Sequence, residues 1–166
     1  MTKSLRVFPL VALMAALPAA AENHRAEPSG YQETPLTLSS PATAVFNARF
    51  NQDQSELTYV LTYAGFTTPV LQSHLHLGQR AMSGGIMVFL CTNLGNGPAG
   101  TPPCPTPAGT VTGTLSASGV VGPAGQGITP GDFAKVVDAI RNGVAYANIH
   151  TQAFPSGELR GQLESN

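Results

Sequence analysis

The chain has 166 residues, of which 10% are charged, and its formal net charge is −1 at pH 7. About a quarter of the residues are charged in an ordinary globular domain, and this chain has no basic clusters, so nucleic acid and anionic membranes are poor candidates as partners. The 18 glycines and 14 prolines, together with many β-branched residues, favour an all-β domain with frequent turns.

The first 21 residues have the pattern of a secretory signal peptide. Lys3 and Arg6 precede an apolar run over 7–17, and residues 19–21 are all alanine. The run is too short to span a bilayer well, and no charged segment follows it to stop transfer. We therefore expect cleavage before Glu22, rather than an uncleaved anchor, and a secreted or periplasmic protein with no later transmembrane segment.

After the signal peptide we expect a flexible leader over 22–33 and one β domain over 34–166. The leader is polar and contains Pro28 and Gly30. A short strand is predicted at 34–39. Alternating apolar residues then predict strands over 43–50 and 56–64, joined as a hairpin.

The stretch 71–78 reads Leu-Gln-Ser-His-Leu-His-Leu-Gly and is expected to form a strand. Alternation puts Leu75 and Leu77 on a core face, and it puts His74 and His76 on the opposite face, roughly 6–7 Å apart at Cα. Two imidazoles on one face of a strand can share a metal ion, and they also occur as ordinary hydrogen-bonded pairs.

The next strand, over 86–91, is apolar on both faces and is expected at the centre of a sheet. It ends at Cys91, and a Gly- and Pro-rich loop over 92–108 contains Cys104. In an exported protein this pair favours one disulfide, and the alternative is a pair of cysteine ligands for a metal. A further strand is predicted over 110–116.

A helix is predicted between Pro130 and Asn142. Thr129 can cap its first turn, and Gly143 ends it. Its apolar residues repeat at helical spacing: Phe133, Val136, Val137 and Ile140.

The last two strands, over 144–151 and 157–163, are expected to form a hairpin. Its predicted cross-strand pairs are His150–Glu158, Asn148–Arg160 and Tyr146–Gln162. One face of this hairpin is apolar and belongs to the core. The other face gathers five polar or titratable side chains: Tyr146, Asn148, His150, Glu158 and Arg160.

Three stretches of this sequence resemble the CHRD domain, the module named after chordin. They are Ser-His-Leu-His-Leu-Gly at 73–78, Tyr-Ala-Asn-Ile-His-Thr at 146–151, and Pro-Ser-Gly-Glu-Leu-Arg-Gly-Gln-Leu at 155–163. The resemblance extends from about 37 to 163. It implies an antiparallel, immunoglobulin-like β-sandwich with one short helix before the last two strands. It implies no enzyme activity.

The His-x-His strand followed by Gly78 is also similar to the copper-binding strand of copper–zinc superoxide dismutase. That enzyme needs further histidines and an aspartate to hold two metals. This chain offers only His150 as an additional histidine in a suitable place, so the similarity does not extend to a complete dismutase site.

Two interpretations of the site follow from these patterns. In the first, His74, His76 and His150 bind Cu²⁺ or Zn²⁺, and the carboxylate of Glu158 accepts a hydrogen bond from the other nitrogen of one of the rings. In the second, the histidines belong to a buried polar network with Tyr146, Asn148, Glu158 and Arg160.

The sequence contains no Gly-x-Ser-x-Gly, Walker or dinucleotide-binding motif. We therefore expect a non-catalytic binding or structural module for an unidentified protein or small ligand. The alternative is an exported copper- or zinc-binding protein, including one with dismutase-like activity.

Overall fold

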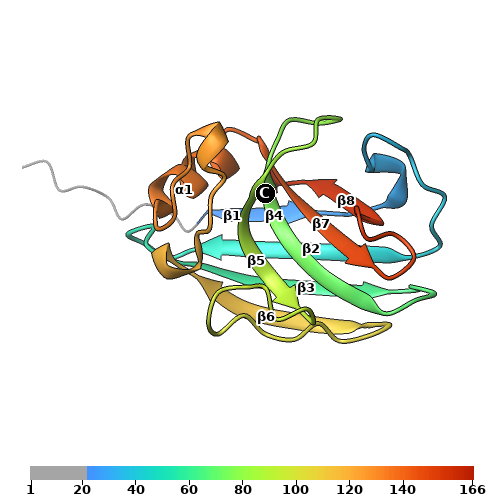
Figure 1. Cartoon of the computed structure of the whole chain (residues 1–166). Helices are drawn as coiled ribbons and strands as arrows, with labels where there is room; N and C mark the ends of the chain where they lie inside the picture. Colours follow the sequence, from blue (N-terminus) through green and yellow to red (C-terminus); the bar gives the residue numbers. More distant parts are fainter. Residues whose placement is uncertain (1–21) are drawn as a thin grey trace, which may run out of the picture.

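The computed structural model describes residues 22–166, and nine strands form two antiparallel sheets in this part of the chain (Figure 1). The first sheet contains β1 (Asn23–Ala26), β2 (Thr43–Phe50), β3 (Leu57–Ala64), β6 (Gly109–Leu115) and β9 (Glu164–Ser165). The second contains β4 (Val70–Leu77), β5 (Ile86–Thr92), β7 (Ala145–Thr151) and β8 (Leu159–Gln162). The strand orders are β6-β3-β2-β1-β9 and β5-β4-β7-β8. The predicted antiparallel β-sandwich is therefore confirmed.

The core lies between the two sheets and follows the alternation of the sequence. In β2 and β3 every second side chain is buried, as the period-two pattern predicts. Two tyrosine hydroxyl groups reach across the core, because Tyr59 donates to the carbonyl oxygen of Leu90 at 2.5 Å and Tyr63 donates to that of Pro105 at 2.6 Å. Most of the largest fully buried side chains come from these inner faces: Phe46, Phe50, Leu57, Leu61, Leu75, Met87, Leu90, Ile149 and Leu159.

The helix α1 (Phe133–Arg141) precedes β7, as predicted. The side chain of Asp132, rather than Thr129, caps it by accepting from the backbone N–H of Lys135 at 3.4 Å. Gly143 follows with φ of +65°, which suits a residue that ends a helix. Within residues 22–166 the other helical elements are three short 3₁₀ turns: η1 (Gly30–Gln32), η2 (Ala117–Gly119) and η3 (Ala124–Gln126).

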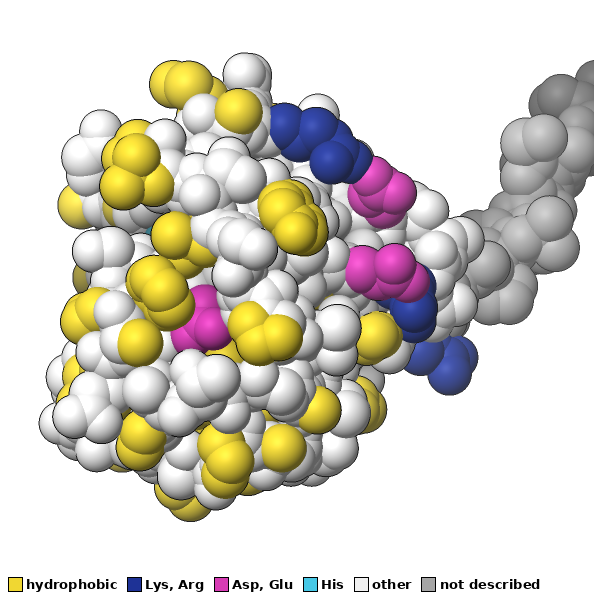
Figure 2. Space-filling model, turned by 90° about the vertical axis from the view of Figure 1, so that its right-hand side faces the viewer, with side chains coloured by type: hydrophobic (Ala, Val, Ile, Leu, Met, Phe, Trp, Pro, Cys, Tyr) yellow, Lys and Arg dark blue, Asp and Glu magenta, His cyan; other side chains and the backbone are white. Residues whose placement is uncertain are grey.

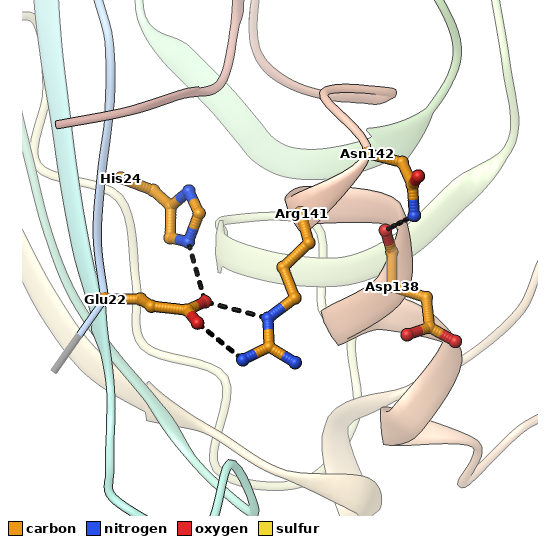
Figure 3. Close-up of polar contacts among 5 residues, drawn as sticks. All are labelled: Glu22, His24, Asp138, Arg141 and Asn142. Atoms are coloured by element: carbon orange, nitrogen blue, oxygen red, sulfur yellow. Dashed lines mark hydrogen bonds and ion pairs between the residues drawn. The ribbon is translucent and has the colours of Figure 1, made fainter. Parts of the chain in front are cut away.

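The segment expected to be a flexible leader contributes a strand to the sandwich. β1 pairs with β2 on one side and with β9 on the other. Arg141 of α1 donates to both carboxylate oxygens of Glu22, at 2.8 and 2.6 Å, and Nε2 of His24 lies 3.9 Å from that carboxylate (Figure 3). The expectation of a loose leader is therefore wrong for the residues around β1.

The strand predicted at 34–39 is absent, because these residues form an irregular segment that packs against η1. The backbone N–H of Leu38 donates to the carbonyl oxygen of Gly30 at 2.8 Å, which turns the chain back on itself.

The strand β5 is buried, but it lies at the edge of its sheet rather than at its centre. Its outer side is covered by the segment after η2, where Val120 bridges to Val88 and the N–H of Val121 donates to the carbonyl oxygen of Met87 at 2.9 Å. The free edge of β5 is therefore covered by a short segment and not by a second neighbouring strand.

Cys91 and Cys104 form the predicted disulfide. The side chain of Asn93 holds the same loop, because its amide donates to the carbonyl oxygens of Val70 and Cys104 and its oxygen accepts from the N–H of Cys104.

Few charges lie on the face shown in Figure 2, where Lys and Arg gather beside acidic groups along one margin. Hydrophobic and uncharged side chains cover most of the remaining surface of that face. Within residues 22–166 no helix is both long enough and apolar enough to cross a bilayer. The signal peptide was predicted for residues 1–21, which lie outside the described part of the chain.

Candidate metal site

Three histidines meet on the outer face of the second sheet. β4 carries His74 and His76, β7 carries His150, and their side chains lie opposite the core residues Leu75 and Ile149. One nitrogen from each ring can be chosen so that all three atoms lie within 4.8 Å of one another. The predicted cluster is therefore present.

The cluster is buried although it lies on the outer face. His74 is fully buried, and His76 and His150 are each 7% exposed. The pairing of β4 with β5 is irregular beside it, with register shifts between Ser73 and His74 and between Leu75 and His76. Such bulges are common near functional sites, because they redirect side chains.

Backbone carbonyl groups orient two of the three rings. Nδ1 of His76 lies 2.9 Å from the carbonyl oxygen of Gly84, and Nδ1 of His150 lies 3.0 Å from that of Pro155. A carbonyl oxygen only accepts, so each Nδ1 carries the proton and each Nε2 presents a lone pair. This is the usual arrangement behind a metal-binding histidine.

The ring of His74 lies as close to the ring of His150 as two ligands of one metal ion would. Nδ1 of His74 is 3.2 Å from Nε2 of His150. Two nitrogens bound to one tetrahedral Zn²⁺ at about 2.0–2.1 Å would be about 3.3 Å apart. The same separation also suits a direct hydrogen bond between the two rings.

Two imidazole nitrogens of the cluster have no hydrogen-bond partner among the described residues. Nε2 of His74 and Nε2 of His76 are both buried and unpaired. Buried polar atoms are nearly always paired, and leaving one unpaired costs about 1–3 kcal/mol.

Burial keeps the three imidazoles neutral. Burial, together with smaller effects of the neighbouring His150 and His76, lowers the pKa of His74 to about 2. Burial lowers the pKa of His76 to about 4, although the hydrogen bond to Gly84 acts in the opposite direction. The pKa of His150 is also lowered by burial. Neutral imidazole is the form that binds a metal.

Aromatic rings enclose the site on two sides. Phe89 packs edge-on against His74, with ring centroids 4.4 Å apart. Tyr146 stacks on His76 at 4.8 Å with an interplanar angle of 7°. The guanidinium carbon of Arg160 lies 3.5 Å from the centroid of Tyr146. Tyr146 therefore links His76 to Arg160.

Arg160 joins two loops over the outer face. Its guanidinium group donates to the hydroxyl of Thr34 and to the carbonyl oxygens of Gln79 and Met82, at 3.0, 2.8 and 2.9 Å. It forms no ion pair with Glu158 within residues 22–166. These two members of the predicted polar network are therefore not in contact as a charge pair.

Glu158 is buried but does not hold a histidine ring. Its carboxylate accepts from the hydroxyl groups of Ser40 at 2.6 Å and Thr151 at 2.5 Å. The regular ladder of β7 and β8 contains the predicted pairs Asn148–Arg160 and Tyr146–Gln162, and it stops at Ile149–Leu159. Glu158 lies beyond it, next to Gly157 with φ of +132°. Strand alternation therefore does not determine its direction.

Asn148 connects the site to a residue that the sequence analysis missed. Its amide donates to Oε1 of Glu33 at 2.5 Å and to the carbonyl oxygen of Leu159 at 2.8 Å. Burial raises the pKa of Glu33 to about 7, against the opposing effects of Asn148 and Arg160. Glu33 belongs to an irregular segment, so no periodic pattern could have indicated its position.

One of three comparisons with known proteins gives a match. The family model of the CHRD domain matches residues 25–163, nearly the whole chain. Comparison with curated proteins and with solved structures found no similar protein. The match includes β2 to β8 and all three histidines of the cluster. The chain therefore belongs to the CHRD domain family.

Proposed function

We propose that this protein is an exported, non-catalytic CHRD binding module that holds one transition metal ion, copper or zinc, on His74, His76 and His150. The observation that carries the proposal is the convergence of three buried imidazoles whose candidate ligand atoms lie within 4.8 Å. Two of the rings have their Nδ1 atoms beside backbone carbonyl groups, which leaves Nε2 available.

The alternative of a purely structural polar network has less support. That interpretation expects the histidines to be satisfied by Asn148, Glu158 and Arg160, whose side chains bond to other partners. The hydrogen bonds that the histidines do make are the His74–His150 contact and the contacts of His76 and His150 with backbone carbonyl groups, and these leave Nε2 of His74 and of His76 unpaired. A bound ion would give the cluster the partner that its neighbours do not supply.

The chemistry of the ligands favours copper or zinc. Imidazole suits both metals, whereas Mg²⁺ and Ca²⁺ prefer oxygen. Within residues 22–166 this is the one group of three or more His, Cys, Asp or Glu arranged for a metal. The proposal is therefore for one ion. Export is supported by the signal-peptide pattern and by the Cys91–Cys104 disulfide, which suits an oxidising compartment.

Isothermal titration calorimetry of the mature, untagged protein with Zn²⁺ and with Cu²⁺ tests the proposal. We expect binding of one equivalent by the wild type and its loss in His76→Gln and in His150→Gln, because each variant lacks one imidazole ligand. The matched control is His24→Gln, which removes a buried histidine from the other sheet and should retain binding.

Thermal melts of all four proteins show whether the variants fold. A wild type that binds neither metal would refute the proposal, and so would folded site variants that bind as tightly as the wild type.

A further inference from the structure

The two sheets have four edges, and three of them are protected within residues 22–166. The free side of β8 is covered at Ser29, which exchanges two backbone hydrogen bonds with Arg160 at 3.0 and 3.2 Å. The free side of β5 is covered by the segment at Val120 and Val121. The edge strand β9 has only two residues, and one of them is the acidic Glu164.

The fourth edge, β6, is open. β6 pairs with β3 along its whole length, from Gly109 opposite Tyr63 to Leu115 opposite Leu57. On its other side, no residue between 22 and 166 forms a backbone hydrogen bond with it. Figure 1 shows β6 as the outermost strand of its sheet. A row of backbone N–H and C=O groups is therefore available for another strand.

The sequence of β6 lacks the features that usually prevent strand pairing at an edge. It reads Gly-Thr-Val-Thr-Gly-Thr-Leu, with no charge and no proline. Natural proteins protect long edges with lysine, proline or bulges. The absence of all three from a seven-residue edge points to a surface that pairs with another chain.

We propose that β6 pairs antiparallel with β6 of a second copy of this chain, about a two-fold axis at Thr112. This register places Thr112 opposite its own equivalent and Thr110 opposite Thr114. It places Val111 opposite Gly113 and Leu115 opposite Gly109. A two-fold interface must be complementary to itself in this way.

The exposed face of the paired strands would fit. On this face threonine meets threonine, as Thr62 and Thr110 already do between β3 and β6 with hydroxyl oxygens 3.0 Å apart.

A cleft lies beside β6. It is lined by Tyr59, Phe89, residues 98–102 and residues 112–116. The Tyr59 ring lies against Gly113, where an added Cβ would come within 2.7 Å of it. None of the residues lining the cleft is charged, so two identical edges meet without like-charge repulsion.

Cysteine substitution tests the register. Thr112→Cys should form an intermolecular disulfide under oxidising conditions, because its two copies face each other at the two-fold axis. Thr114→Cys is the matched control, since its two copies would be about 13 Å apart and out of reach. Non-reducing mass spectrometry should find a covalent dimer in the first variant alone. Equal cross-linking in both would overturn the proposal.

Sedimentation equilibrium tests the dimer itself. The wild-type mature protein should be a dimer, and Thr112→Lys should be a folded monomer with the far-UV circular dichroism of the wild type, because two like charges would meet at the axis. The control Thr43→Lys on β2 should remain a dimer. A monomeric wild type, a dimer that survives Thr112→Lys, or a monomer that pairs β6 with an unrelated extended peptide would each refute the second copy as the occupant. Metal binding by Thr112→Lys should match the wild type, so this test is independent of the proposed function.

Discussion

Glu33 has a buried carboxyl group that is mostly neutral below pH 7. Burial raises its pKa in the folded state to about 7, from an ordinary value of 4.5. A raised carboxyl pKa stabilises the fold fully below pH 4.5, and this stabilisation is lost as the pH rises through 7. Each pH unit in this window is worth about 1.4 kcal/mol.

We expect Glu33→Gln to be relatively more stable at high pH than at low pH. Its stability relative to the wild type should increase by up to about 3 kcal/mol between pH 4.5 and pH 8.5, because glutamine is never ionised. Urea unfolding with a chelator present measures this change. Glu27→Gln is the control, since Glu27 forms an exposed pair with Arg25 of a kind that contributes little to stability. A change that is equal for both variants would contradict the prediction.

The sequence predicted the histidine cluster from strand alternation and family resemblance. Alternation placed His74 and His76 on the same face of one strand, and it placed His150 on the face of its strand away from the core residue Ile149. It could not establish that β4 lies next to β7, since those strands are about 70 residues apart and their pairing is not a local property. It also failed for Glu158 and Glu33, whose side-chain directions depend on a positive-φ glycine and on an irregular segment.

Among the larger elements, the loop between β5 and β6 depends on its disulfide. Cys91 and Cys104 are separated by 13 positions in the sequence. In the chain-entropy model, closing a loop of this size contributes about 3 kcal/mol. Replacing both cysteines with alanine should therefore lower the unfolding free energy by about 3 kcal/mol, measured by urea denaturation. Reduction of the wild type should have a similar effect, and a double variant as stable as the oxidised wild type would contradict this.

Strands with clear alternation were predictable, and those defined by distant partners were not. β2, β3, β4 and β7 lie close to their predicted bounds. β1 is short and polar, and it exists as a strand because β2 and β9 pair with it. The edge position of β5 was not predictable either, because its side chains are buried along the strand as those of a central strand would be.

At the scale of the whole molecule, buried histidines should make the fold sensitive to acid. All four histidines of the chain are buried, and burial lowers the pKa of each. Below pH 6.5 the unfolded chain binds protons that the folded chain does not. The free energy of unfolding therefore decreases as the pH is lowered, by up to about 1.4 kcal/mol per pH unit for each histidine. Glu33 acts in the opposite direction between pH 4.5 and 7.

Without metal, we therefore expect a net loss of several kcal/mol between pH 6.5 and 4.5. Urea unfolding across this range measures the loss, and Glu33→Gln should make it steeper because it removes the opposing group. A flat stability profile in the wild type would contradict the neutral, buried state of the histidines.

The proposed metal site has a direct crystallographic test. Crystals of the mature protein grown with one equivalent of Zn²⁺ or Cu²⁺ should give one strong anomalous difference peak at the absorption edge of the metal. We predict that the peak lies about 2.0–2.1 Å from one nitrogen each of His74, His76 and His150. An empty cluster in protein saturated with metal, or a peak bound elsewhere on the chain, would contradict the account.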